Sequence, residues 1–128
     1  MTLHTIMIGL LSVFFLFASS IKILGWHKYV FETQLAMFIQ YGLNRQIMAL
    51  TGFVELFGAT AIWLQGSWAG TLAALALFGT SAGAIICHLI WDTWKDGVPA
   101  MITGALSLIV AWNGREALFE FLDLPGFI

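Results

Sequence analysis

The chain has 128 residues, of which 60% are hydrophobic and only 9% are charged, whereas an ordinary soluble domain carries about 25% charged residues. No Lys, Arg, Asp or Glu occurs in four stretches, residues 1–21, 46–54, 56–91 and 97–114. Such a chain is no soluble globular domain, because a small domain leaves much of its surface in water. Disorder is excluded by the high hydrophobicity, and the net charge of −2 without a basic patch argues against nucleic-acid binding. We therefore expect an integral membrane protein.

We expect one transmembrane domain over residues 1–128, of the all-α class, built as a four-helix membrane bundle. A spanning helix needs about 20 mostly apolar residues. The apolar stretches that meet this need are residues 3–24, 46–65, 69–91 and 98–114, the last of them slightly short unless it continues toward Phe119. The first stretch has no basic segment before it and is longer than the apolar part of a signal peptide, so we expect it to remain as a span.

Helix-ending residues fall where these spans begin and end. Gly25 closes the first span, Asn44 can cap the second, and Gly66 can end it. Pro99 suits the first turn of the fourth span. The connection between the first two spans, residues 27–43, has apolar residues near helical spacing. It predicts a short interfacial or re-entrant helix, with an ordinary loop as the alternative.

The tryptophans predict two interfacial belts, because Trp favours the boundary between lipid and water. One belt comprises Trp26, Trp91 and Trp94, and the other comprises Trp63, Trp68 and Trp112. The first belt is accompanied by Lys28, Arg45 and Lys95, and the second by Arg115. The positive-inside rule then places the first belt at the cytoplasmic face, with both chain termini outside.

Small residues mark the faces along which the spans would pack. They include Gly52 and Gly58 in the second span, a GxxxG pair at Gly79 and Gly83 in the third, and Gly104 in the fourth. Small residues let membrane helices approach closely. One such stripe could instead face a second copy of the chain, which would make a homo-oligomer.

Glu55 is the strongest single functional signal. It lies about ten residues beyond Arg45, which is roughly 15 Å into a hydrocarbon core about 30 Å thick. An unpaired carboxylate is costly there, so Glu55 must be paired, hydrogen-bonded or protonated. It is either a ligand-binding or proton-carrying group or a structural pin between helices, and the sequence leaves both open.

Lys22 and Ser19 share one face near the end of the first span, and Lys22 could pair with Glu55 or with His88. The alternative for Lys22 is that its amine reaches the interface. His88 precedes Asp92 by four residues, so its ring can donate to that carboxylate. The candidates for ligand binding or a proton relay are therefore Lys22, Glu55, His88, Ser19 and Asp92, and no catalytic residue is assigned.

Several other kinds of site find no support in the sequence. The single cysteine, Cys87, cannot form an internal disulfide. The three histidines occupy different ends or loops, without the spacing of a zinc or haem site on one helix. We therefore expect no metal site, and any electrons for a redox reaction would come from a partner protein.

Three segments taken together resemble the DoxX-like family of small membrane proteins. They are FLFASSIKILGW at residues 15–26, GFVELFGATAIWL at residues 52–64 and AGAIICHL at residues 82–89. The resemblance implies a four-helix membrane bundle, and it implies that Lys22, Glu55 and His88 match recurring polar positions of the family. The family is named for a small membrane subunit associated with thiosulfate:quinone oxidation, and other relatives resemble assembly factors or chaperones. The bundle is also similar to vitamin K epoxide reductase, whose paired cysteines this chain lacks.

The first functional hypothesis is an accessory subunit of a membrane redox system that binds a quinone- or lipid-type molecule. Such a subunit would lie in the inner membrane of a bacterial-type cell with a partner membrane or redox protein, and it would not be an autonomous enzyme. The second hypothesis is a non-enzymatic scaffold or assembly factor whose small-residue faces receive a partner helix. A small-molecule transporter is a third, for which one bundle of this size would need to oligomerise.

Overall fold

A computed structural model describes residues 2–122 of the chain. Over that range it has no strand, which confirms the predicted all-α class. The helices in chain order are α1 Leu3–Leu24, α2 Lys28–Gln40, α3 Arg45–Ala61, α4 Trp68–Trp91, α5 Val98–Asn113 and α6 Arg115–Leu122. The connection between the first two long helices is therefore helical, as its apolar spacing predicted.

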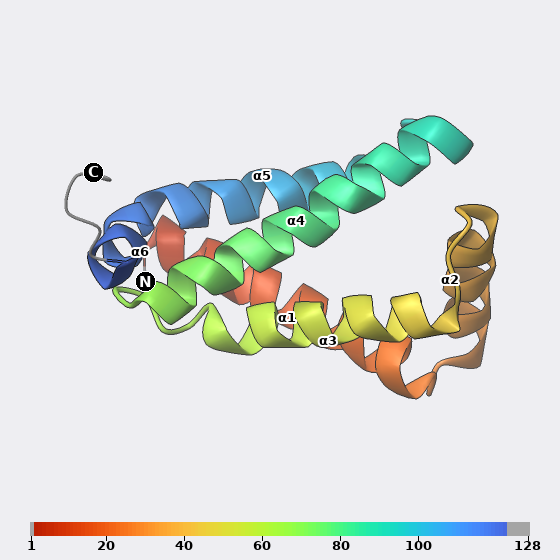
Figure 1. Cartoon of the computed structure of the whole chain (residues 1–128), viewed down its shortest axis with the longest axis horizontal. Helices are drawn as coiled ribbons and strands as arrows, with labels where there is room; N and C mark the ends of the chain where they lie inside the picture. Colours follow the sequence, from red (N-terminus) through yellow and green to blue (C-terminus); the bar gives the residue numbers. More distant parts are fainter. Residues whose placement is uncertain (1, 123–128) are drawn as a thin grey trace.

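Four of the helices run lengthwise through the molecule (Figure 1). Helix α1 packs along α3, α3 along α4, α4 along α5, and α5 contacts α1 again. Helix α2 stands across one end of this group, and α6 lies at the opposite end, where α1 also begins (Figure 1). The beginning of α1 and the whole of α6 therefore lie at the same end of the group.

The helix ends obey local capping rules at the positions that the sequence marks. Gly25 follows α1 in the left-handed conformation, with φ of 66°, and a glycine adopts this without steric cost. The Asn44 side chain accepts a hydrogen bond from the Ile47 amide at 2.9 Å and so caps α3. Pro99 lies in the first turn of α5. These caps set the places where the chain turns.

One predicted helix end is wrong. Helix α3 ends at Ala61, four residues short of the predicted residue 65. The residues after it form a turn that packs against the start of α4, so closely that a side-chain carbon on Gly70 would lie 2.3 Å from the Leu64 carbonyl oxygen. The fourth apolar stretch, by contrast, ends within one residue of its predicted limit at residue 114, because α5 ends at Asn113 and the chain toward Phe119 forms a separate helix, α6.

Interlocking small and large side chains form the core between the long helices. Leu11 and Phe15 of α1 pack with Ala59 of α3 and with Ala74 and Leu77 of α4. A side-chain carbon on Gly58 would lie 2.4 Å from the Leu77 side chain, so this glycine is needed where α3 crosses α4. Gly79 and Gly83, by contrast, have no neighbour where a side chain would project.

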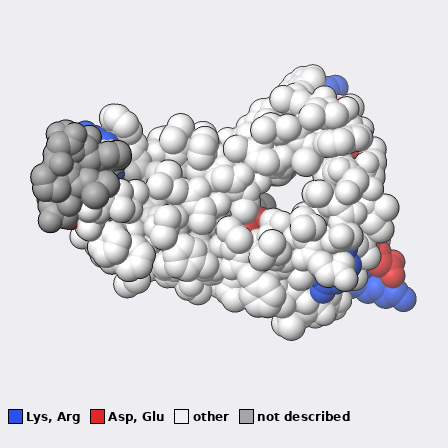
Figure 2. All heavy atoms as spheres, viewed as in Figure 1, with Lys and Arg blue, Asp and Glu red and all other residues white. Residues whose placement is uncertain are grey.

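The outer surface of the long helices is apolar. Large hydrophobic side chains are exposed along all four of them, among them Val13, Phe53, Ile86 and Ile102. Figure 2 shows charged atoms at the two ends of one face and a long uncharged stretch between them, apart from acidic atoms at the edge of an opening. Among the described helices, α1 and α4 are long and apolar enough to cross a membrane. Helix α5 is apolar but has 16 residues, and α3 has 17.

Candidate functional site

A hollow lies where α4 and α5 diverge from α1 and α3. It consists of two adjoining parts of about 460 Å³ and about 310 Å³. Both parts are lined by Lys22, Gln34, Glu55 and His88, together with small and apolar side chains. Since the two parts share these walls, we describe them as one cleft. A mostly apolar cleft with a few convergent polar groups is typical of a small-molecule site.

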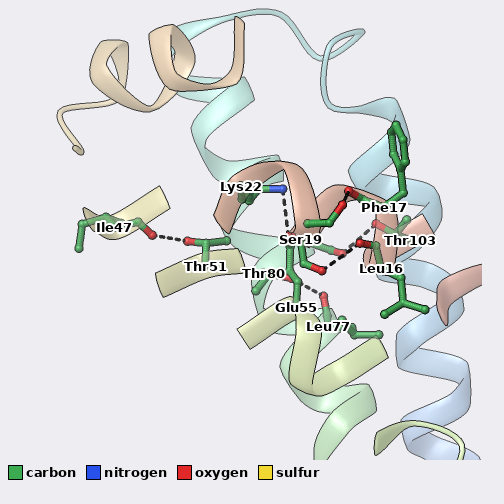
Figure 3. Close-up of polar contacts among 12 residues, drawn as sticks. Leu16, Phe17, Ser19, Lys22, Ile47, Thr51, Glu55, Leu77, Thr80 and Thr103 are labelled. Carbon is green, nitrogen blue, oxygen red and sulfur yellow. Dashed lines mark hydrogen bonds and ion pairs between the residues drawn. The ribbon is translucent and has the colours of Figure 1, made fainter. Parts of the chain in front are cut away.

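The deepest polar group of the cleft is an ion pair between two long helices. The Lys22 amine lies 2.9 Å from the Glu55 carboxylate, and both side chains are about nine-tenths buried. Figure 3 shows them pointing toward each other from α1 and α3. Each charge offsets the desolvation of the other, because an isolated buried charge would be far more costly. Of the two partners that the sequence allowed for Lys22, the structure selects Glu55.

Gly52 brings the two charges together. It lies about one turn before Glu55, and a side-chain carbon there would sit 2.9 Å from the Ile23 side chain and 3.0 Å from that of Lys22. The missing side chain therefore allows α3 to approach the last turn of α1. The Arg45 guanidinium fixes the same contact by donating to the backbone carbonyls of Lys22 at 2.7 Å and Ile23 at 2.9 Å.

A second polar group lies at the rim of the cleft, at the end of α4. The His88 ring nitrogen Nδ1 is 3.0 Å from the Asp92 carboxylate, the contact that their spacing predicted. The Tyr41 hydroxyl donates to the same carboxylate and lies 3.1 Å from His88 Nδ1. These three side chains connect the end of α2 to the end of α4.

This rim group shifts the ionisation of its members. The hydrogen bond from Tyr41 holds the pKa of Asp92 below its ordinary value of 3.8, and His88 acts in the same direction. Burial, followed by the contact with Asp92, raises the pKa of Tyr41 far above its ordinary value of 10.0. At neutral pH the carboxylate is therefore ionised and the phenol protonated, which is the arrangement that the hydrogen bond requires.

Ser19 is the one predicted residue that the structure leaves outside the cluster. It is fully buried where α1 meets α3, and its hydroxyl donates to the Leu16 carbonyl at 3.2 Å. Figure 3 shows that hydroxyl directed to its own helix and not to Lys22. Ser19 instead belongs to the close packing of α1 against α3, because a side-chain carbon on Gly52 would lie 3.3 Å from the Ser19 carbonyl oxygen.

Sequence reasoning missed Tyr41 and Gln34. Both belong to the segment between α1 and α3, whose position over the cleft cannot be read from periodicity. Gln34 lines both parts of the cleft, and its buried side-chain oxygen receives no hydrogen bond. A polar amide at the centre of an interfacial helix was the available signal. Within residues 2–122 no three His, Cys, Asp or Glu side chains gather into a metal site.

Comparison with known proteins identifies the family. The model of the DoxX-like family matches residues 6–113, which include Lys22, Glu55 and His88. Neither the curated proteins nor the solved structures provide a match. The family match covers most of the sequence and confirms the resemblance carried by the three segments around these residues. The chain belongs to the DoxX-like family and is a membrane protein of that family.

Proposed function

We propose that this protein is an accessory subunit that binds a quinone- or lipid-type molecule in its cleft, as part of a membrane redox system. The observation that carries the proposal is the buried Lys22–Glu55 pair in the wall of a cleft that is otherwise mostly apolar. The Lys22 ammonium has three donors, so it can keep Glu55 and still donate to a carbonyl or hydroxyl oxygen of a ligand.

The remaining lining suits the apolar part of such a ligand. Phe14, Phe15 and Ala18 of α1 face Pro99 and Ala100 of α5 across the larger part of the cleft. The polar group at the rim, His88 with Asp92, offers a second contact and a route for protons toward the water phase. In this proposal Lys22, Glu55 and His88 bind the head of the ligand, while Asp92 orients His88.

The proposal places all four long helices across the bilayer of a bacterial-type inner membrane. Helices α3 and α5, with 17 and 16 residues, are near the lower limit for a span. Their support is their packing alongside α1 and α4 and the apolar side chains that they expose. We place the end that carries α2, Arg45 and Lys95 at the cytoplasmic face.

A redox role makes this chain an accessory subunit and not an autonomous enzyme. Its one cysteine cannot form a dithiol within the chain. Electrons would therefore reach the bound molecule from a partner protein docked at one end of the helices. The contribution of this chain would be to hold and orient the ligand and to exchange its protons.

The proposal is tested by extracting the purified protein with organic solvent and identifying the released molecules by mass spectrometry. The test variant is the double substitution Lys22→Met with Glu55→Leu, which removes both charges without leaving one of them buried. The control is Thr60→Val, on the exposed face of α3, where the hydroxyl bonds only its own helix. We expect a stoichiometric quinone or lipid from the parent and the control, and its loss from the double variant. Bulk lipid alone in all three would contradict the proposal.

One observation favours a second function, a scaffold for another membrane protein. Gly79 and Gly83 of α4 are exposed with nothing packed against them, Gly83 at the border of the smaller part of the cleft, and small residues let a partner helix approach closely. Under this hypothesis the Lys22–Glu55 pair is a structural pin. Substitution of Gly79 and Gly83 by Leu would then abolish co-purification of a partner, while the extract would contain only bulk lipid.

A further inference from the structure

Helix α2 forms a wall of the cleft without being part of the packed core. None of its residues is fully buried, yet Gln34 and Met37 line both parts of the cleft and Phe38 lines the smaller one. Figure 1 shows α2 standing apart from α4, across the end of α1 and α3. Figure 2 shows an opening through this end of the molecule. The cleft is therefore bounded on this side by one helix that rests on little else.

The two ends of α2 are held differently. Near its beginning, the Phe31 ring packs 4.9 Å under the Arg45 guanidinium, which is itself bonded to the end of α1. At its far end, Gly42 has φ of 80° and no neighbour within 4 Å of where a side chain would project. This glycine ends α2, because its amide donates to the Ile39 carbonyl at 3.0 Å and the Leu43 amide donates to the Phe38 carbonyl at 2.9 Å. No side chain packs against Gly42 itself, so the contacts that hold this end against α4 are those of its neighbours Tyr41 and Gln40.

Tyr41 and Gln40 fasten this end of α2 to the end of α4. The buried Tyr41 ring packs against the rings of Trp91 and His88, with centroids 5.5 Å and 5.9 Å away. The Tyr41 hydroxyl bonds the Asp92 carboxylate and contacts His88, and the Gln40 amide donates to the Trp91 carbonyl at 3.2 Å. The bond to Asp92 is the stronger of the two fastenings, because hydrogen bonds to charged groups are worth more than neutral ones. All of these partners lie at the end of α4.

The fastened position of α2 is energetically unfavourable for the Gln34 side chain. Its side-chain oxygen is buried there and receives no hydrogen bond, and a buried acceptor left without a donor is destabilising. Movement of α2 away from the cleft would return this oxygen to water. The bonds of Tyr41 and Gln40 therefore favour the fastened position, whereas the unpartnered Gln34 oxygen opposes it.

We propose that α2 is a movable strap across the cleft and that Tyr41 is the positioning residue that fastens it. Release of the strap opens the side of the cleft between α2 and α4, and its return holds the occupant against Lys22 and Glu55. The motion itself does not depend on the occupant, but the role in ligand exchange rests on the proposed function.

The motion can be measured by pulsed electron paramagnetic resonance in detergent micelles. Spin labels are attached at Ala36→Cys on α2 and at Lys95→Cys beyond α4, and the distance between them reports the position of the strap. Both sites are exposed. Cys87→Ala removes the native thiol, so that only the two introduced cysteines are labelled. Tyr41→Phe removes the hydroxyl only. The matched control is Tyr29→Phe, the other tyrosine of the chain, which is exposed at the start of α2.

We expect a second, longer distance in Tyr41→Phe, with the ratio of released to fastened molecules raised about tenfold, as for loss of one hydrogen bond to a charged group. Tyr29→Phe should keep the parent distribution. An unchanged distribution in Tyr41→Phe would overturn the proposal, and so would an equal change in Tyr29→Phe. A thermal melting curve of each variant shows whether the whole protein has become unfolded. If the distance distribution broadens only in a variant that no longer melts cooperatively, that result also counts against the strap.

Ligand exchange is measured separately, with decylubiquinone as the probe. We expect Tyr41→Phe to speed its dissociation about tenfold, while Tyr29→Phe leaves the rate unchanged. If the parent protein does not bind this probe, the proposed quinone function fails, whereas the distance measurement still decides whether the strap moves. If the probe binds and dissociates equally fast from both variants, the role of the strap in exchange is contradicted.

Discussion

The two ends of the helix group differ in how closely their helices approach one another. At the end near α6, Thr71 of α4 donates to the Gly114 carbonyl at 2.6 Å, and His4 of α1 contacts Gln65 at 3.0 Å, so the chain is drawn together. At the end near α2, α4 moves away from α3 and a cleft opens (Figure 1). At the closed end, near α6, the polar contacts join helices that lie close together. At the open end, near α2, polar side chains also join helices, but Lys22, Glu55 and His88 line the cleft as well.

The contacts of a buried polar side chain indicate whether its role is structural or functional. Ser12 and Ser107 are buried among the long helices, but each hydroxyl donates to a backbone carbonyl and neither side chain lines the cleft. Lys22, Glu55 and His88 have similar burial and face a space of about 460 Å³. An intramembrane ionisable group that faces a cavity is a functional candidate. The following predictions test this division between the two ends, from the largest effect to the smallest.

The largest effect is expected from Glu55→Leu alone. This change leaves the Lys22 ammonium buried without a partner, and breaking a buried pair in this way costs about 3–5 kcal/mol. The double substitution with Lys22→Met should recover most of that loss. Thermal melts in detergent give the comparison. Equal stability of the single and double variants would show that Lys22 reaches water without Glu55.

Gly52→Ala should be the next most damaging. The added carbon would lie 2.9 Å from the Ile23 side chain and 3.0 Å from that of Lys22, and overpacking of this kind costs about 1–3 kcal/mol. Gly79→Ala is the matched control, because nothing lies within 4 Å of its added carbon and alanine favours a helix. Relative to the parent protein, the melting temperature of Gly52→Ala should therefore fall and that of Gly79→Ala should rise. A Gly52→Ala protein as stable as Gly79→Ala would contradict the close approach of α3 to α1.

A smaller effect is expected at the closed end. Thr71→Val removes the hydroxyl that joins α4 to Gly114, and a single hydrogen bond in a membrane protein is worth about 0.6 kcal/mol. Stability should fall by about that amount, with no change in the molecule extracted from the cleft. Loss of that molecule from Thr71→Val would show that the two ends do not act separately.

The smallest effect, on the distance between α2 and α4, is expected when the pH is changed between 7 and 10. The pKa of Asp92 is lowered, so its contribution to the fastened strap is complete above the ordinary value of 3.8 and is lost as the pH falls through the lowered value. The pKa of Tyr41 is raised, so its hydroxyl remains a donor well above pH 10. The groups around this contact are His88, Cys87 and Asp96. The distance between α2 and α4 should therefore stay constant from pH 7 to 10, and its lengthening near pH 8 would contradict this account of the fastening.

The sequence predicts the helices better than it predicts how their ends meet. Long apolar stretches with Gly25, Asn44 and Pro99 at their limits determine where helices begin and end, because capping is a local property. The early end of α3 at Ala61 depends on packing of the next turn against Gly70, a contact between elements that no local pattern records.

The difference between local patterns and contacts between distant elements also explains which site residues could be predicted from the sequence. Lys22 and Glu55 were found because charged residues in apolar stretches are conspicuous, and the His88–Asp92 contact because both lie on one helix. Tyr41 and Gln34 were missed because their importance arises from the placement of α2 over the cleft. That placement depends on distant partners, the Asp92 carboxylate and the Arg45 guanidinium.

Binding of an amphipathic ligand in the cleft around Lys22 and Glu55, as proposed here, can be tested by photolabelling. The purified protein is labelled with an azido-substituted quinone, and the labelled peptides are mapped by mass spectrometry. The account predicts labelling of residues that line the cleft on α1, α2 and α4, suppressed by excess decylubiquinone and absent from the double variant of Lys22 and Glu55. Labelling confined to the exposed outer faces of the helices, and unaffected by decylubiquinone, would contradict it.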